Sequence, residues 1–252
     1  MVYLEYRILT NRPGLLGDIT SLIGLLNINI CQVSGVSGNW RGFLLDGDEQ
    51  KINALKTSLT QIDNIEITAI RTPGSLDRIA IKHGTRLSPV NTNPLTYSFV
   101  RDELGLLIDF LGEILKETGN IIIGIRGMPR VGKTEASIAG CVNANKRWVL
   151  VSSTIIRQNL RNSLAPEESS ADCVLLIDGI STTSRGGKRH NALVKEILQW
   201  PVPKIIEHPD VFVRDGSFGE VNFDWVIELR RQVGEEINYQ DITSSFSAFD
   251  IS

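Results

Sequence analysis

The first seventy residues alternate between the hydrophobic patterns of strands and helices. Residues 3–9 alternate apolar and polar side chains as a half-buried strand does, and an Asn-Arg-Pro-Gly turn follows them. Residues 15–26 then carry apolar side chains at helical spacing. The predicted elements that follow are a hairpin of residues 28–36 and 41–47, a helix over 48–62 and a strand over 65–70. The order βαββαβ predicts a ferredoxin-like domain over residues 1–72.

Residues 73–98 are predicted to be a connector. They hold three prolines and two glycines and show little sustained periodicity, so we place a domain boundary within them. Four side chains give the segment a basic character, namely Arg78, Lys82, His83 and Arg86. Two interpretations stay open, a solvated linker and an arm that contacts phosphate.

The remainder of the chain, residues 99–252, alternates strand and helix after an amphipathic helix over 101–119. The predicted strands are residues 121–126, 147–153, 173–179, 204–208 and 224–229, and the predicted helices are residues 133–145, 154–164 and 190–200. Alternation of this kind indicates an α/β domain, a parallel sheet of five strands with helices on both faces.

Residues 127–134 read Gly-x-x-x-x-Gly-Lys-Thr between a predicted buried strand and a predicted helix. A nucleotide triphosphate needs backbone N–H donors directed into one concavity, a mobile cation and a hydroxyl for Mg²⁺, and this segment supplies all three. The helix that follows favours anions at its N-terminus. The predicted nucleotide-binding residues are Gly127, Met128, Pro129, Arg130, Val131, Gly132, Lys133, Thr134 and Glu135.

A second element, an aspartate at a strand end, supports a magnesium site. Asp178 ends a short buried strand, and the carboxyl ends of parallel strands meet at one edge of a sheet. We expect Thr134 and Asp178 to hold Mg²⁺ and Lys133 to contact the phosphates. The alternative is an ordinary glycine-rich turn and a surface aspartate. Glu135 either orients water or metal, or is a helix-start acid favoured by the helix dipole.

A basic segment after Asp178 completes the expected catalytic set. Residues 185–190 are predicted to be a flexible loop in which Arg185 or Arg189 neutralises charge that develops during phosphoryl transfer. The other interpretation is an ordinary exposed loop. Residues 207–221 are either a lid, with Arg214 on the nucleotide or Asp210 on substrate or metal, or a capping loop.

Composition excludes several classes of protein. The chain has 252 residues, with 26 Lys and Arg against 29 Asp and Glu, so no overall positive field favours nucleic acid. Cys31, Cys141 and Cys173 follow no metal or disulfide spacing and are expected to be buried thiols. No long apolar run suggests a membrane span, so we expect a soluble, cytoplasmic protein.

The N-terminal pattern, with its Arg-Pro-Gly turn and the Ile-Asn-Ile that opens the second strand, resembles the ACT domains over residues 3–72. The resemblance implies a regulatory module that pairs into a homodimer and binds an amino-acid-like effector. It implies that Asn11, Gly14 and Leu15 face this effector, and the start of the following helix suits a carboxylate. The other interpretation is a packing module with an empty turn.

The segments "NRPGLLGDI", "GIRGMPRVGKTE", "ANKRWVLVSST" and "EHPDVFV" together resemble the YmfK-like uncharacterised bacterial proteins, an ACT-like domain followed by a P-loop domain. We expect a Mg²⁺-dependent protein that binds ATP, since no Asn-Lys-x-Asp guanine motif is present. An NTPase or phosphotransferase regulated through the ACT-like domain is the first hypothesis. The alternatives are a small-molecule or nucleotide kinase and a non-enzymatic ATP-dependent switch.

Overall fold

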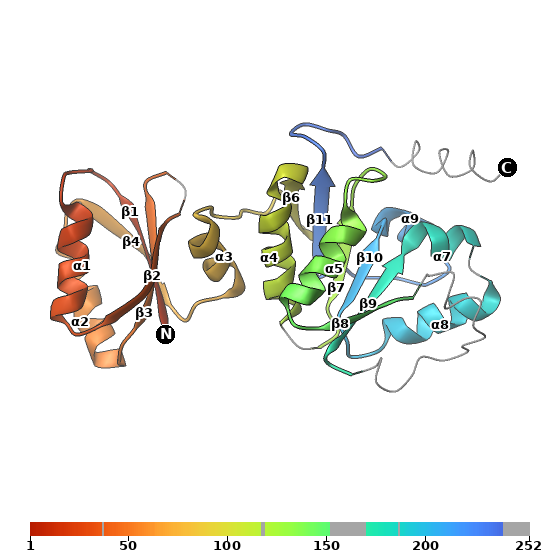
Figure 1. The fold of residues 1–252 in the computed structure, drawn as a ribbon, viewed down its shortest axis with the longest axis horizontal. Helices are drawn as coiled ribbons and strands as arrows, with labels where there is room; N and C mark the ends of the chain where they lie inside the picture. Colours follow the sequence, from red (N-terminus) through yellow and green to blue (C-terminus); the bar gives the residue numbers. More distant parts are fainter. Residues whose placement is uncertain (37, 117–118, 152–169, 186, 239–252) are drawn as a thin grey trace. The chain divides into compact units, whose positions relative to one another are not determined.

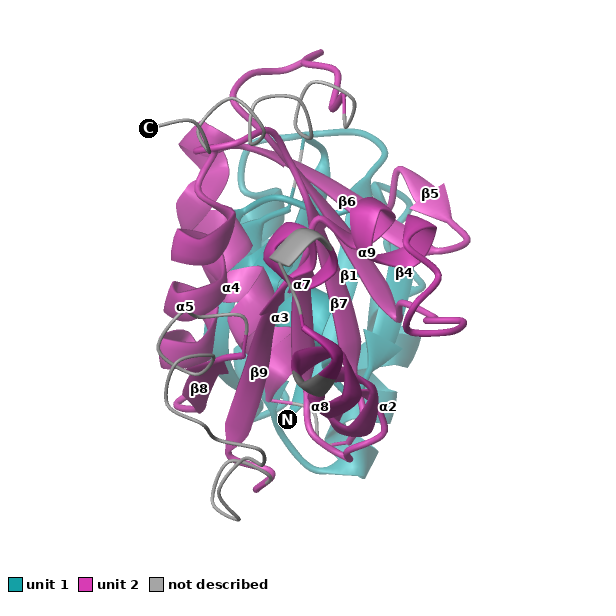
Figure 2. Ribbon diagram, turned by 90° about the vertical axis from the view of Figure 1, so that its right-hand side faces the viewer, with its two compact units in different colours: residues 1–87 teal, residues 88–252 magenta. Residues whose placement is uncertain are grey.

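A computed structural model of the chain describes residues 1–36, 38–116, 119–151, 170–185 and 187–238, although not the side chains of 184, 185 and 189. The chain divides into two compact units, Met1–Leu87 and Ser88–Ser252 (Figure 2). Each unit has its own sheet.

The first unit is built on a four-stranded antiparallel sheet. Its first six elements are β1 (Val2–Ile8), α1 (Leu15–Leu25), β2 (Asn29–Gly35), β3 (Trp40–Asp46), α2 (Glu49–Leu59) and β4 (Ile65–Arg71), as Figure 1 shows. The strand order is β2-β3-β1-β4, and the βαββαβ order predicted from the sequence is confirmed. Apolar residues of α1 and α2 pack on one face of the sheet, among them Ile19, Ile23 and Leu55.

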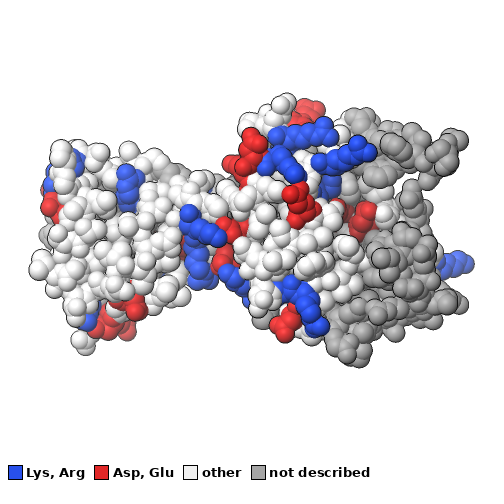
Figure 3. Space-filling model, viewed as in Figure 1, with Lys and Arg blue, Asp and Glu red and all other residues white. Residues whose placement is uncertain are grey.

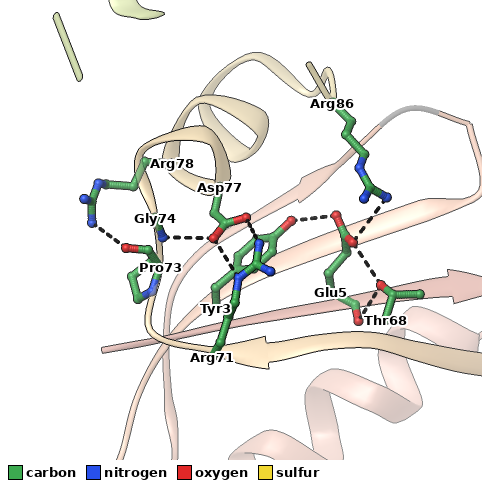
Figure 4. Close-up of polar contacts among 9 residues, drawn as sticks. All are labelled: Tyr3, Glu5, Thr68, Arg71, Pro73, Gly74, Asp77, Arg78 and Arg86. Carbon is green, nitrogen blue, oxygen red and sulfur yellow. Dashed lines mark hydrogen bonds and ion pairs between the residues drawn. The ribbon is translucent and has the colours of Figure 1, made fainter. Parts of the chain in front are cut away.

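A third helix, α3 (Ser75–His83), lies on the opposite face of this sheet, where Ile81 packs on Tyr3 and Leu44. Polar contacts also hold it (Figure 4). Asp77 accepts from Arg71 Nη2 at 2.5 Å and from the Gly74 N–H at 2.9 Å. The sequence placed a domain boundary within residues 73–98 and did not predict α3 there. Gly74 and Gly84 flank this helix rather than interrupt it.

The second unit holds a seven-stranded sheet. Its elements are β5 (Asn91–Thr92), β6 (Leu95–Val100), the 3₁₀ turn η1 (Arg101–Glu103), α4 (Leu104–Leu115), β7 (Ile122–Arg126), α5 (Lys133–Asn143), β8 (Arg147–Leu150), β9 (Cys173–Asp178), α7 (Gly179–Arg185), α8 (Lys188–Leu198), β10 (Lys204–Glu207), α9 (Pro209–Arg214) and β11 (Trp225–Arg230). The strand order is β5-β6-β11-β7-β10-β9-β8, and every neighbouring pair is parallel except β5 with β6.

The sequence predicted five strands for this sheet. The two that it missed, β5 and β6, lie largely in the segment predicted to be a connector. Helices cover both faces of this sheet, with α4 and α5 on one side and α8 and α9 on the other (Figure 2). Alternating side chains of β9 explain this arrangement, because Cys173, Leu175 and Ile177 all join the cluster that contains residues of α8 and α9.

Two further expectations change. The basic loop expected at residues 185–190 is mostly helical at the backbone, since Arg185 ends α7 and α8 begins at Lys188. The helix predicted over 154–164 lies outside the described residues. Cys31 is exposed on the edge strand β2 rather than buried, whereas Cys141 and Cys173 are buried. Among the described residues, none of the helices combines the length and apolar character needed to cross a membrane.

Candidate functional site

The glycine-rich loop of residues 127–134 joins β7 to α5, at the carboxyl edge of the parallel strands. Gly132 has a φ of +108°, a conformation that side-chain-bearing residues rarely adopt, and it precedes the first residue of α5. The loop therefore ends where the free N–H groups of a helix begin, the arrangement that suits a phosphate. Met128, Pro129 and Arg130 form the outer part of the loop, and Val131 is buried beneath it.

Lys133 is folded back across the loop. Its Nζ donates to the carbonyl oxygens of Gly127 and Met128, both at 2.9 Å. Only 5% of the residue is exposed, and burial lowers the pKa of its ammonium group, while the carboxylates of Glu207 and Asp178 act in the opposite direction. The cation thus lies inside the loop, close to two carboxylates.

Two carboxylates end adjacent strands beside Lys133. Glu207 is the last residue of β10 and is paired in register with Asp178, the last residue of β9. The Thr134 hydroxyl lies beside the Glu207 carboxylate. Burial raises the pKa of Glu207 and nearby Asp178 adds to this effect, while the Thr134 hydroxyl and Lys133 oppose it. Thr134, Asp178 and Glu207 therefore converge at one point of the sheet edge.

Asp178 also organises the chain that follows it. Its carboxylate accepts from the Ser181 hydroxyl at 2.6 Å and from the Ile180 N–H at 3.0 Å. These bonds fix the start of α7 and the orientation of the carboxylate. Among the described residues, no cluster of three His, Cys, Asp or Glu side chains forms a metal cage. Magnesium in proteins commonly uses one or two carboxylates and takes its other ligands from phosphate and water.

His208 follows Glu207 in a left-handed conformation, with φ +55°, and is 5% exposed. Burial lowers its pKa to about 4, and Lys133 contributes in the same direction against Asp178 and Asp210. The imidazole is therefore neutral near pH 7. A strained backbone at a buried polar residue is a feature often found at functional sites.

Further charged side chains lie at the ends of β7 and β11. Arg126, the residue before Gly127, donates to both carboxylate oxygens of Asp210, at 2.9 and 2.7 Å, and lies 3.5 Å from Glu228. Arg230 donates to Glu228 at 2.7 Å. Arg231 Nη2 donates to the Pro129 carbonyl at 3.1 Å, which ties the segment after β11 to the glycine-rich loop.

Charges of both signs lie side by side in this region. On the face drawn in Figure 3, basic and acidic side chains are interspersed over the end of the second unit where β11 ends and α5 begins. Among the described residues at this end, neither sign of charge forms an extended patch of its own (Figure 3).

Sequence reasoning located part of this site. Lys133, Thr134, Glu135 and Asp178 lie on the loop or beside it, but the side chains of Arg185 and Arg189 lie outside the described part of the structure. Glu207, His208 and Arg101 were missed. The signal for Glu207 was present, because it is a carboxylate at the end of a predicted buried strand, as Asp178 is.

Glu135 has a partner that its sequence position does not indicate. Arg101 Nη2 lies 2.8 Å from a Glu135 carboxylate oxygen, and Arg101 Nη1 donates to the Val131 carbonyl at 2.8 Å. Neither interpretation of Glu135 from the sequence included this ion pair.

The first unit contains a separate hollow of about 290 Å³ at the start of α1. The three residues that the resemblance pointed to, Asn11, Gly14 and Leu15, all line it, together with Tyr6 and Arg41. Tyr6 is fully buried, and its hydroxyl has no hydrogen-bond partner among the described residues. Burial raises the pKa of Tyr6 to about 12, so the hydroxyl is a neutral donor.

Comparison with known proteins identifies the family. The family model described as "Protein of unknown function (DUF3388)" matches residues 67–250. A relative from Bacillus subtilis (strain 168), described as "Uncharacterized protein YmfK", is 45% identical over 256 residues, which cover 98% of this chain and 95% of the relative. The similarity spans both units. The chain belongs to the family described as Protein of unknown function (DUF3388).

Proposed function

We propose that the second unit is a P-loop domain that binds ATP with Mg²⁺ and hydrolyses or transfers its terminal phosphoryl group. One observation carries the proposal: Lys133 and Thr134 of the loop meet Asp178 and Glu207 at the ends of adjacent strands. A phosphate loop needs a cation and a metal-binding hydroxyl beside an acidic strand end, and these side chains supply them.

Each residue has a defined part in this proposal. Backbone N–H groups of the loop hold the phosphates, and Lys133 exchanges its bonds to Gly127 and Met128 for phosphate oxygens. Thr134 and Asp178 would hold Mg²⁺, which neutralises charge on the β and γ oxygens. Arg185 and Arg189 remain the proposed source of further positive charge during transfer.

Glu207 favours an enzyme over a non-enzymatic switch. Its carboxylate, on a half-buried residue, lies beside the Thr134 hydroxyl and so next to the proposed metal position. A carboxylate there can orient an attacking water or accept a proton from an acceptor hydroxyl. Small-molecule or nucleotide kinase activity is therefore the second candidate, and a switch that binds ATP without turnover is the third.

The first unit is, in this proposal, an ACT-like regulatory domain that forms a homodimer and binds an amino-acid-like effector. The hollow lined by Asn11, Gly14 and Leu15 supports it, because the buried Tyr6 hydroxyl offers an unused donor and Arg41 a positive charge. Coupling between an effector and a second site is typically about 1 to 3 kcal/mol. We expect a bound effector to change ATP affinity by a factor of about 5 to 150.

The test of the nucleotide site is calorimetric titration of ATP, ADP and GTP into the full chain, with and without Mg²⁺. We expect Mg²⁺-dependent binding of ATP that Lys133→Ala and Thr134→Ala abolish. Lys116→Ala, at an exposed lysine that follows α4, is the matched control and should bind as the wild type does. The absence of nucleotide binding by the wild type would overturn the proposal.

Turnover separates the three candidates. Phosphate release without an acceptor indicates an NTPase, ADP formation that depends on an added acceptor indicates a kinase, and tight binding without either indicates a switch. Glu207→Gln should preserve ATP binding and lower turnover by about 100-fold or more if Glu207 handles a proton.

For the first unit, thermal-shift measurements with each of the twenty amino acids identify the effector. Equal ATP affinity with and without that effector would contradict the coupling.

A further inference from the structure

A second hollow in the chain lies on the α9 side of the seven-stranded sheet and encloses about 720 Å³. Its walls come from α9, from β7 and β11, and from the segment of residues 221–223. This volume is in the range of pockets that take small organic molecules, about 300 to 1,000 Å³. None of its lining residues belongs to the glycine-rich loop or to the hollow of the first unit.

One side of the hollow is apolar. It is lined by Val213 of α9, by Phe223 of the segment before β11 and by Val226 of β11, and Val213 is 44% exposed. An exposed valine next to a phenylalanine ring gives an apolar or aromatic ligand a surface to cover, which is favourable by about 25 cal/mol per Å² removed from water.

The other side carries three charged residues, Arg126, Asp210 and Arg214. The guanidinium of Arg126 is engaged by both carboxylate oxygens of Asp210. Arg214 is exposed and forms no hydrogen bond or ion pair with any described residue. The lining therefore holds two positive charges and one negative charge, and the positive charge left over is on Arg214.

We propose that this hollow binds a small organic anion, with its apolar or aromatic body on Val213, Phe223 and Val226 and its carboxylate or phosphate paired with Arg214. An arginine binds either group through two parallel N–H donors, which makes these anions the natural occupants. Asp210, fixed by Arg126, offers its remaining acceptor capacity to a hydroxyl or amino group on the same ligand.

The position of the hollow places its ligand close to the glycine-rich loop. Arg126 and Asp210 are shared with an adjoining hollow of about 480 Å³ that extends to Glu228 and Arg230. Arg126 directly precedes Gly127 in the chain. The inference goes beyond the proposed function, because it rests on the lining residues and does not require a nucleotide on the loop.

The test uses four simple probes on the full chain. Benzoate and phenyl phosphate carry an aromatic ring and an anion, whereas benzamidine carries a cation and phenol carries no charge. Binding is followed by saturation-transfer NMR and titration. We expect the two anions to bind more tightly than benzamidine and phenol, and Arg214→Ala to weaken the anions by about tenfold or more, the value of a charge-assisted hydrogen bond.

Three variants make the result specific. Arg214→Lys should bind the anions with intermediate affinity, since it keeps the charge but not the paired donors. Val213→Trp should block all four probes by filling the hollow, without removing a charge. Arg7→Ala, at a half-exposed arginine of the first unit, is the control and should bind all four as the wild type does.

Several outcomes would overturn the inference. They are anion binding that Arg214→Ala leaves unchanged, benzamidine binding as tightly as benzoate, and no detectable binding of either anion. Phenyl phosphate binding lost in Lys133→Ala and kept in Arg214→Ala would assign that probe to the glycine-rich loop and reject the hollow. Retained benzoate binding in Lys133→Ala would support the hollow even if ATP does not bind.

Discussion

The guanidinium of Arg101 occupies the space in which a β-carbon at residue 132 would lie, so the two residues are in direct contact across the glycine-rich loop. Arg101 also donates to the Val131 carbonyl and pairs with Glu135. It therefore contacts the loop on both sides of Gly132 in the sequence. Because these contacts are to a backbone carbonyl and to Glu135, Arg101 acts as a positioning residue for the loop.

Gly132→Ala should destabilise the second unit by about 2 to 4 kcal/mol. The alanine would be strained at a φ of +108°, and its β-carbon would displace Arg101 Nη1, the end of a flexible side chain, from the Val131 carbonyl. Gly119→Ala is a matched comparison, because Gly119 has a φ of +119° but no neighbouring atom within 4 Å of a β-carbon. The free energy of unfolding of Gly119→Ala should therefore fall only by the cost of backbone strain. Urea unfolding of the three proteins measures the difference.

Arg101→Ala in the Gly132→Ala background separates the two contributions further. Removal of the guanidinium relieves the overlap, so the double variant should be more stable than the sum of the two single changes predicts, by about 1 kcal/mol or more. Additive losses, or equal losses in Gly132→Ala and Gly119→Ala, would show that the contact with Arg101 costs nothing.

The fold was predictable from hydrophobic periodicity where elements are long and bounded by turns. The six elements from β1 to β4 and the strands β7, β9, β10 and β11 all follow from it. β6 was not identified, although residues 95–100 alternate, because the prolines at 89 and 94 suggested a linker. Its pairing with β11, more than a hundred residues later, is a long-range contact that local patterns do not reveal.

The candidate site was predictable to the extent that its residues share a local motif or a strand end. Lys133 and Thr134 belong to a motif, and Asp178 ends a buried strand. Glu207 also ends a strand, but its significance depends on β10 lying between β7 and β9, which only the sheet order reveals. Arg101 reaches the loop from a turn 30 residues earlier in the chain, a contact made by tertiary packing.

Asp77→Asn should loosen α3 from the sheet of the first unit. Asp77 is 7% exposed and accepts from Arg71 Nε and Nη2 and from the Gly74 N–H at the start of the helix (Figure 4). An amide there turns one acceptor into a donor that faces Arg71. Because Arg71 is more than half exposed, we expect a modest loss of about 1 to 3 kcal/mol.

Hydrogen exchange of the α3 amides measures this change, and it should accelerate in Asp77→Asn before the rest of the unit is affected. Asp63→Asn, at an exposed aspartate of the same unit, should leave exchange and stability unchanged within about 0.5 kcal/mol. Unaltered α3 exchange in Asp77→Asn would mean that Ile81 and its apolar contacts hold the helix by themselves.

Lys204 should make the stability of the second unit depend on pH in the alkaline range. It is fully buried, with Nζ donating to Asn120 Oδ1 at 2.7 Å and to the carbonyls of Trp200 and Val202. Burial lowers its pKa from 10.5 to about 8. Between these values the unfolded chain binds a proton that the folded chain does not, so stability rises with pH across this window.

Comparison with Lys204→Met isolates this effect. The wild type should gain about 2 kcal/mol relative to the variant between about pH 8 and about pH 9.5, at roughly 1.4 kcal/mol per pH unit. Lys56→Met, at an exposed lysine of α2, should run parallel to the wild type. Parallel curves for Lys204→Met as well would show that the three oxygen acceptors keep the ammonium group charged in the folded protein.

Two tyrosines of β1 should respond in opposite ways to loss of the hydroxyl. Tyr3 and Tyr6 are both buried, but the Tyr3 hydroxyl donates to Glu5 at 2.8 Å, whereas the Tyr6 hydroxyl has no partner among the described residues. Tyr3→Phe leaves a buried carboxylate short of a donor and should cost about 1 to 3 kcal/mol. Tyr6→Phe removes an unsatisfied polar group and should be neutral or stabilising by up to about 1 kcal/mol.

Thermal unfolding of the two variants in the absence of effector tests this contrast, with each serving as the control for the other. A loss for Tyr6→Phe as large as that for Tyr3→Phe would show that the Tyr6 hydroxyl already has a partner, and would remove it from the proposed effector site. A second test repeats the unfolding with the amino acid that most stabilises the wild type. Its stabilising effect should fall in Tyr6→Phe and persist in Tyr3→Phe, because Tyr6 lines the hollow and the Tyr3 hydroxyl is directed at Glu5.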